Sequence, residues 1–263
     1  MKQPKTKVDP MYRPVPFLLG VFSVTWLCTI LMTAMDYNSH PFLFSFLDFL
    51  ENASPLICAL LLLQKPLLSL PSLTQFLLGT AVRPARCLAV FFLFAAQFLN
   101  FYCFRSPEAF CSPQTFLTVF IGQLLFGGGL EEAGWRGYLL PCFYRKWHIL
   151  LSSTAVSLIW VFWHLPYFIF PGNLQSEQNF FSYTLIGIVT GLILTAIYLL
   201  TNSVLLCMLF HSWQNALVMT IPADTGNPWF MLIFLLLGAV SALICTFLYR
   251  PRHSLLPKKK IEN

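Results

Sequence analysis

The sequence predicts an all-α polytopic membrane protein, a helical bundle with about eight transmembrane helices, and three observations lead to this prediction. Hydrophobic residues make up 57% of the 263 residues and charged residues only 10%, against roughly 25% charged residues in an average soluble domain. The mean hydropathy is +0.70. Apolar runs, each close to the ~20 residues that cross a bilayer, alternate with short polar breaks. Because a soluble fold needs a charged surface, soluble enzymes, disordered chains and fibrous proteins are excluded.

Eight apolar runs are predicted to span the membrane. In order they are Phe17–Met35, Phe46–Leu63, Leu88–Tyr102, Gln114–Glu132, Ile149–Phe170, Tyr183–Leu200, Ser203–Ile221 and Trp229–Leu248. A further apolar stretch, Leu67–Leu78, is short and lies beside prolines, which favours an interfacial position or a loop. The segment before the first span resembles the start of a signal peptide. The span itself is too long and lacks a small-residue cleavage site, so we expect a retained anchor.

The positive charges predict the orientation, because cytoplasmic loops are enriched in Lys and Arg. With eight spans, most of them fall on one side, whereas the other side holds Arg105 with Asp36, Glu108, Glu177 and Asp224. The basic residues on the first side are Lys2, Lys5, Lys7, Arg13, Lys65, Arg83, Arg86, Arg145, Lys146, Arg250, Arg252, Lys258, Lys259 and Lys260. Both termini are therefore expected in the cytoplasm.

The same pattern predicts one integral membrane domain over 17–249, between a cytoplasmic N-terminal segment, 1–16, and a basic cytoplasmic tail, 250–263. No internal repeat is visible. The net charge of +6 is explained by topology and predicts no nucleic-acid partner. For the tail, contact with anionic lipid is the alternative to a purely topogenic role.

The eight cysteines contain no C-x-x-C pair, so no zinc finger or redox motif is predicted. Cys103 and Cys111 flank one polar loop and can form a disulfide if that loop is extracytoplasmic.

Two adjacent acids inside an apolar span form the first candidate for chemistry, because ionisable residues are costly in a membrane and mark functional sites. Glu132 and Arg136 are four residues apart, so they share a helix face and can pair. Glu131 points about 100° away, which leaves its carboxylate available for chemistry. The preceding glycines, 127–129, either allow close helix approach or form a mobile stretch.

Two histidines and an amide complete the candidate site. His164 lies in an otherwise apolar span, and His211 and Asn215 are four residues apart, so both can address one point. At ~1.5 Å per residue, both histidines and Glu131 fall near the middle of the membrane. A buried carboxylate can act as a general base on water, one histidine can orient that water, and the other can join the amide in stabilising an oxyanion. This set of residues suits water attack on an amide or ester.

In order, the motifs E-E-x-x-x-R, a lone span histidine and H-x-x-x-N resemble the CPBP family of type II CAAX prenyl endopeptidases and bacteriocin-immunity proteins. The resemblance covers about 114–217, within a catalytic core expected at about 114–220. It implies an intramembrane endopeptidase with a helical, cytosol-facing cavity. The resemblance implies that Glu131 is the catalytic glutamate and that His164 aids it. It implies that His211 and Asn215 form the oxyanion site. Glu132 and Arg136 are then supporting residues. One departure is Trp160, since that motif is often written F-x-x-x-H.

Alternatives stay open for the mechanism and for the function. Glu131, His164 and His211 are by residue type a possible zinc set, although no H-E-x-x-H is present and the histidines lie on separate helices. We expect no cofactor, with zinc as the alternative. The resemblance also permits a non-catalytic scaffold or a bacteriocin self-immunity protein. A transporter is a weaker alternative because no inverted repeat is visible.

The expected partners are the lipid bilayer and a membrane-associated protein or peptide substrate, with or without a prenyl group. The expected location is the cell membrane, as a multi-pass protein, with a bacterial cytoplasmic membrane as its setting.

Overall fold

The computed structural model describes residues 13–35, 37–63, 70–79, 83–106, 111–170 and 174–249. These residues are helical apart from their connections and an isolated bridge between Arg105 and Ala223. The all-α prediction is therefore confirmed for this part of the chain. Most of the predicted N-terminal segment, 1–16, and the whole basic tail, 250–263, lie outside the described residues, as does the start of the stretch Leu67–Leu78.

Five helices are long and apolar enough to cross a membrane. They are α1 (Pro14–Thr33), α2 (Pro41–Leu62), α5 (Pro84–Cys103), α11 (Phe180–Thr201) and α13 (Pro228–Leu248). Except in α11, proline stands in the first turn of each of these helices. In the first turn the missing N–H of proline leaves no helical hydrogen bond unmade. The side chain of Asn179 caps α11 by accepting from the Ser182 backbone N–H at 3.0 Å. These spans suggest a multi-pass membrane protein.

Two of the eight predicted spans are not continuous helices. The predicted span Gln114–Glu132 is divided into α6 (Pro113–Phe126) and α7 (Gly128–Gly134), with Gly127 between them. The predicted span Ile149–Phe170 is divided into α9 (Ile149–Trp163) and α10 (Leu165–Ile169). Pro166 accounts for the second break, since it cannot donate a helical hydrogen bond. The sequence-based spans are wrong at these two points because hydropathy records length and polarity but not helix continuity.

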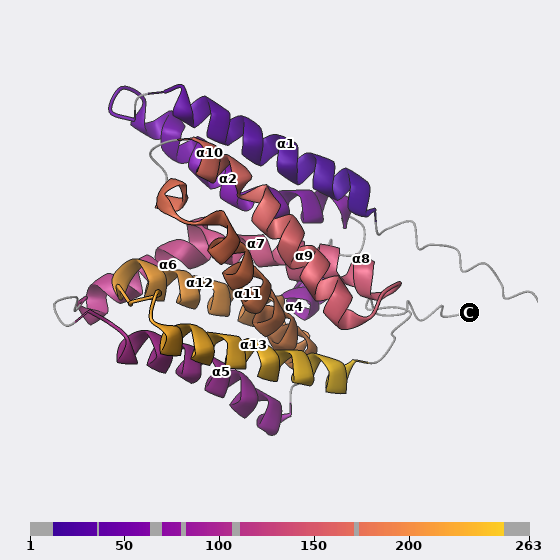
Figure 1. The fold of residues 1–263 in the computed structure, drawn as a ribbon. Helices are drawn as coiled ribbons and strands as arrows, with labels where there is room; N and C mark the ends of the chain where they lie inside the picture. The colour runs from indigo at the N-terminus through magenta and orange to yellow at the C-terminus, as the bar shows by residue number, and fades with distance from the viewer. Residues whose placement is uncertain are drawn as a thin grey trace, which may run out of the picture.

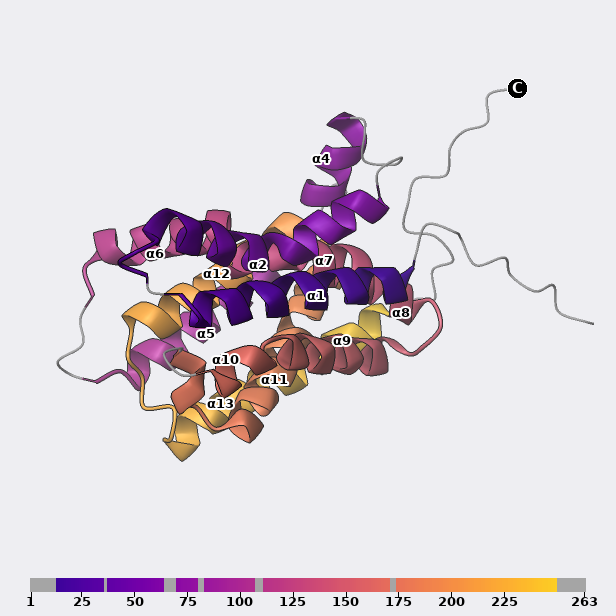
Figure 2. The ribbon, with the colours of Figure 1, turned by 90° about the horizontal axis from the view of Figure 1, so that it is seen from above.

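The remaining helices are shorter. The chain continues from α7 through a π-helical turn, Trp135–Leu139, into α8 (Leu140–Tyr144), and a 3-10 turn, Leu174–Glu177, precedes α11. The helix α12 (Val204–Thr220) matches the seventh predicted span and, like α9, is apolar but short. The helix α4 (Leu70–Leu78) corresponds to the predicted interfacial stretch and extends from one end of the bundle (Figure 2).

The short helix α7 lies at the centre of the bundle, with the other helices around it. α1 and α2 lie along one edge and α5 and α13 along the opposite edge (Figure 1). Between them, α7 packs against α2 on one side and α12 on the other, and α11 packs against α9, α12 and α13. This arrangement buries the short helix that carries both candidate acids at the centre of the bundle.

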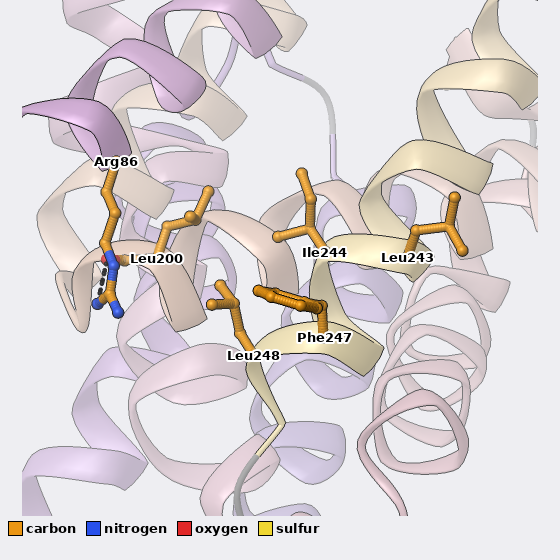
Figure 3. A pocket seen from close by; sticks show the side chains of 6 residues that line it. All are labelled: Arg86, Leu200, Leu243, Ile244, Phe247 and Leu248. Carbon is orange, nitrogen blue, oxygen red and sulfur yellow. Dashed lines mark hydrogen bonds between the residues drawn. The ribbon is translucent and has the colours of Figure 1, made fainter.

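The surface carries two hollows away from the candidate residues. An apolar groove of about 530 Å³ lies among α5, α11 and α13, where Arg86 donates to the Leu200 carbonyl at 3.3 Å (Figure 3). A second hollow, of about 270 Å³, includes Trp213 of α12. None of the six predicted site residues lines either hollow. Cys103 and Cys111 are free cysteines, so the possible disulfide is not formed.

Candidate active site

The break at Gly127 lets α7 enter the bundle beside α12. A Cβ added at Gly128 would lie 2.5 Å from Asn215 Nδ2 and 3.0 Å from His211 Nε2, and one added at Gly129 would lie 2.6 Å from Ser212 Oγ. A larger residue would displace the Asn215 and His211 side chains at Gly128, and at Gly129 it would meet Ser212 and the backbone of Leu124. Of the two interpretations of the glycine run, the structure therefore supports close helix approach.

Glu132 lies in a cationic environment. It is fully buried and pairs with Arg136 one turn later, with 3.1 Å between Arg136 Nη1 and each carboxylate oxygen. The predicted ion pair is present. His211 of α12 adds a second contact, donating from Nδ1 to Glu132 Oε1 at 2.8 Å. Arg136 also donates from Nη2 to the Gly191 carbonyl at 3.4 Å, so α7, α11 and α12 meet at this carboxylate.

Glu131, its neighbour, faces two indoles. Its Oε2 accepts from Trp160 Nε1 at 2.6 Å and from Trp135 Nε1 at 3.2 Å. Sequence reasoning named no partner for the Glu131 carboxylate, although Trp135 stands four residues later on the same helix face. That spacing was the signal available in the sequence. Among the described residues no donor reaches Oε1, so one oxygen is held and the other is left for a ligand.

His164 sits at the junction between α9 and α10. Its Nδ1 lies 2.9 Å from the Trp160 carbonyl oxygen. Because a carbonyl can only accept, Nδ1 must carry the proton, and Nε2 of the neutral ring is then an acceptor. The described residues supply no partner for Nε2. The side chain is 7% exposed, so this nitrogen faces a restricted space.

The predicted residues gather around Trp160. Its ring centroid lies 4.6 Å from that of His164 and 5.6 Å from that of His211, while its indole N–H bonds Glu131. On α12, Asn215 and His211 both approach Gly128. Of the six residues, Glu132 and Arg136 are engaged with each other, Glu131, His164 and His211 contact Trp160, and Asn215 lies beside His211 at Gly128.

The amide of Asn215 has an additional partner that sequence reasoning missed. Its Nδ2 donates to Gln123 Oε1 at 2.8 Å, and the same oxygen accepts from the Gly128 backbone N–H at 3.3 Å. Gln123 thus bridges the break between α6 and α7 and holds the Asn215 amide there. Since the amide has two N–H groups, one stays available.

A second buried carboxylate was also missed. Glu51 of α2 is 2% exposed and accepts from the Tyr167 hydroxyl at 2.6 Å and the Thr29 hydroxyl at 2.8 Å. It lies inside a predicted span, so the rule that singled out Glu131 applied to Glu51 equally.

The residues present do not fit the zinc alternative. In the described ranges, no group of three or more His, Cys, Asp and Glu side chains is arranged to hold a metal ion. His211 directs Nδ1 at Glu132 rather than Glu131, and Glu131 Oε2 is already bonded by two indoles. These bonds leave Glu131 Oε1 and Nε2 of both histidines without a partner in the described ranges, so the misfit rests on the lack of a suitable group of ligands there.

The comparison with protein families agrees with the resemblance noted from the motifs. Residues 113–217 match the family described as "Type II CAAX prenyl endopeptidase Rce1-like". No curated protein matches the chain. The matched segment runs from the start of α6 into α12 and includes all six predicted site residues. Residues 113–217 are therefore a domain of the type II CAAX prenyl endopeptidase Rce1-like family, which suggests a CAAX-type intramembrane protease acting on a protein substrate.

Proposed function

We propose that this chain is an intramembrane endopeptidase in which Glu131 activates water to hydrolyse a peptide bond close to the membrane. The carrying observation is that each central side chain has one atom fixed and one left over. Glu131 is held through Oε2, His164 through Nδ1 and His211 through Nδ1. Glu131 Oε1 and the Nε2 atoms of both histidines have no partner among the described residues. Such a set is oriented by the protein yet available to water and substrate.

In the proposed reaction, Glu131 Oε1 and His164 Nε2 accept hydrogen bonds from one water. Glu131 takes a proton as the water oxygen bonds to the carbonyl carbon. The resulting oxyanion receives hydrogen bonds from Asn215 Nδ2 and from Nε2 of a protonated His211. The C–N bond then breaks, and Glu131 returns the proton to the amine leaving group.

Glu132 has a different proposed role. Its carboxylate accepts the Nδ1 proton of His211, an arrangement that favours the charged ring and orients Nε2. Arg136 balances the carboxylate from the other side. We therefore assign both residues a supporting role. The substrate is proposed to be a membrane-associated protein or peptide, with or without a prenyl group.

The test compares the membrane proteomes of three strains carrying the parent chain, Glu131→Gln or Glu177→Gln. Glu177→Gln is a matched control, since it makes the same change at an exposed position. We expect at least one longer precursor to accumulate in Glu131→Gln alone. The candidate is then incubated with purified protein to recover the same cleavage.

A farnesylated C-a-a-X peptide and its unprenylated twin serve as defined probes beside the candidate precursor. Cleavage of the farnesylated probe alone would establish a prenyl requirement. Identical proteomes in all three strains, with no cleavage of any probe, would reject the peptidase and favour a non-catalytic scaffold or self-immunity protein.

A further inference from the structure

The second buried carboxylate, Glu51, lies outside the family segment, on α2. Its two oxygens accept from two different helices, Oε1 from Tyr167 of α10 and Oε2 from Thr29 of α1. In the described part of the chain, both recorded ion pairs involve Glu132 and neither involves Glu51. A buried carboxylate without a cationic partner is expensive, so its retention requires an explanation beyond packing.

The partner of Glu51 is close to the catalytic centre in both sequence and space. Tyr167 stands three residues after His164, and its backbone N–H donates to the His164 carbonyl at 3.0 Å. The two rings are in contact, with centroids 5.6 Å apart. The bond from Tyr167 to Glu51 therefore fixes the first turn of α10, whose other end is the histidine itself.

The junction needs an external anchor because it lacks the usual helical bonds. α9 ends at Trp163. Pro166, in the first turn of α10, has no N–H with which to continue the helical hydrogen bonds of α9. A second tie from the same side supports this interpretation: Trp26 of α1 donates from Nε1 to the Trp163 carbonyl at 3.3 Å. α1 and α2 thus hold the residues on both sides of His164.

We propose that Glu51 and Tyr167 are positioning residues for His164, with the Tyr167–Glu51 hydrogen bond fixing the direction of His164 Nε2. The inference rests on the proposed catalytic role of His164. Neither residue touches the reacting atoms in this scheme. What Glu51 must supply is an acceptor for the Tyr167 hydroxyl, and a glutamine carbonyl can supply it too.

The test uses Tyr167→Phe, Glu51→Leu, their double variant and the conservative Glu51→Gln. Tyr138→Phe is the matched control. Tyr138 is another buried tyrosine whose hydroxyl bonds a distant segment, accepting from the Arg13 backbone N–H at 2.8 Å. Cleavage of the farnesylated C-a-a-X peptide, or of the precursor from the proteome comparison, gives kcat and KM.

We expect Tyr167→Phe and Glu51→Leu each to lower kcat about ten-fold, the value of one hydrogen bond to a charged group, with KM nearly unchanged. The double variant should lose no more than either single variant, because both remove one interaction. Glu51→Gln should retain most of the parent kcat. Equal losses in Glu51→Gln and Glu51→Leu would overturn the positioning role and make the carboxylate itself a reactant.

A second readout needs no cleavage. Purified variants are treated with diethyl pyrocarbonate, and modification of His164 and His211 is followed by peptide mass spectrometry. We expect His164 to be modified several-fold faster in Tyr167→Phe and Glu51→Leu, and His211, held by Glu132, to be unchanged. If Tyr167→Phe behaves like Tyr138→Phe in both kcat and labelling, the proposal is rejected.

The two readouts separate this inference from the proposed function. Full activity of Glu131→Gln would remove the assigned base and leave the labelling result standing. Conversely, an inactive Glu131→Gln with unaltered His164 labelling in Tyr167→Phe would retain the peptidase and remove the positioning pair.

Discussion

The two faces of α7 give adjacent glutamates opposite surroundings. Glu132 meets a guanidinium and an imidazole, whereas Glu131 meets two indole N–H groups. Both side chains are almost completely buried, at 0% and 3% exposure, so burial alone does not distinguish them. The difference lies in the charge of their partners.

This comparison explains how one dipeptide can serve two purposes. A carboxylate that pairs with a guanidinium and also bonds an imidazole is compensated in charge and links neighbouring helices, so it is suited to hold the bundle together. A carboxylate held only by neutral donors keeps its negative charge uncompensated, so it is suited to accept a proton. The ~100° step between neighbouring helical residues is sufficient to separate the roles.

The sharpest contrast should come from Glu131→Gln. We expect this variant to cleave the farnesylated C-a-a-X peptide about 10²–10⁴-fold more slowly, the usual contribution of a general base. Its thermal midpoint in detergent should remain close to that of the parent, because a glutamine oxygen can still accept from both indoles. A large drop in the midpoint would instead assign Glu131 a structural role.

Glu132→Gln should act more through stability, with a further loss of rate because His211 loses its acceptor. Removing this charge leaves Arg136 and His211 buried without their carboxylate, a change that typically costs about 3–5 kcal/mol. Chemical denaturation in mixed micelles and membrane abundance both report it. Should Glu132→Gln be as stable as the parent yet inactive, the division of roles between the two acids would be reversed.

Trp160→Phe tests the face of α7 on which Glu131 accepts from neutral indole N–H groups. It deletes the 2.6 Å donor to Glu131 but keeps an aromatic ring between the two histidines. A lost hydrogen bond to a charged group is worth about 1.5–3 kcal/mol, so the rate should fall by about ten-fold or somewhat more. The unfolding midpoint should change little, and an unchanged rate would mean that the indole N–H is not needed.

Gly128→Ala tests the approach of α12 to α7. The new methyl group would meet Asn215 and His211, and such overpacking typically costs about 1–3 kcal/mol. Gly122→Ala is the matched control, because a Cβ at Gly122 finds nothing within 4 Å. Differential scanning fluorimetry should separate the two variants, and equal behaviour would show that the helices yield easily.

Chelation should have the smallest effect. Since no group of three or more His, Cys, Asp and Glu side chains in the described ranges is arranged to hold a metal ion, exhaustive chelation of purified protein should leave the cleavage rate within about two-fold of the untreated value. Loss of activity with recovery on adding about one zinc per chain would return the three residues to the role of ligands.

The extent of successful sequence-based prediction differs between fold and site. Hydropathy located the five long spans to within a few residues, because a membrane helix is read from composition and length. It missed the breaks at Gly127 and His164, because an interrupted helix in the bundle interior is as apolar as a continuous one. Local spacing likewise predicted the ion pair between Glu132 and Arg136.

The contacts between helices could not be read from spacing. Trp160 reaches Glu131 from a helix 29 residues away, and His211 bonds Glu132 across 79 residues. Sequence reasoning therefore named the candidate residues but left Glu131 without its indole donors. Glu51 was missed for a different reason: it is an ionisable residue inside a predicted span, like Glu131, but no motif surrounds it.

The two bonds of Glu51 also bear on how the chain is made. A glutamate at the middle of a span opposes insertion, by about 2.5–3.5 kcal/mol for an acidic residue on insertion scales. Its first partner, Thr29, is synthesised 22 residues earlier, so α1 and α2 can enter the bilayer as a hairpin in which the acid is already bonded. Tyr167 follows 116 residues later, about 6–23 s at the usual 5–20 residues per second of translation. During that interval Glu51 Oε1 lacks its tyrosine donor, so the α1–α2 hairpin carries a half-satisfied carboxylate until α10 has been made.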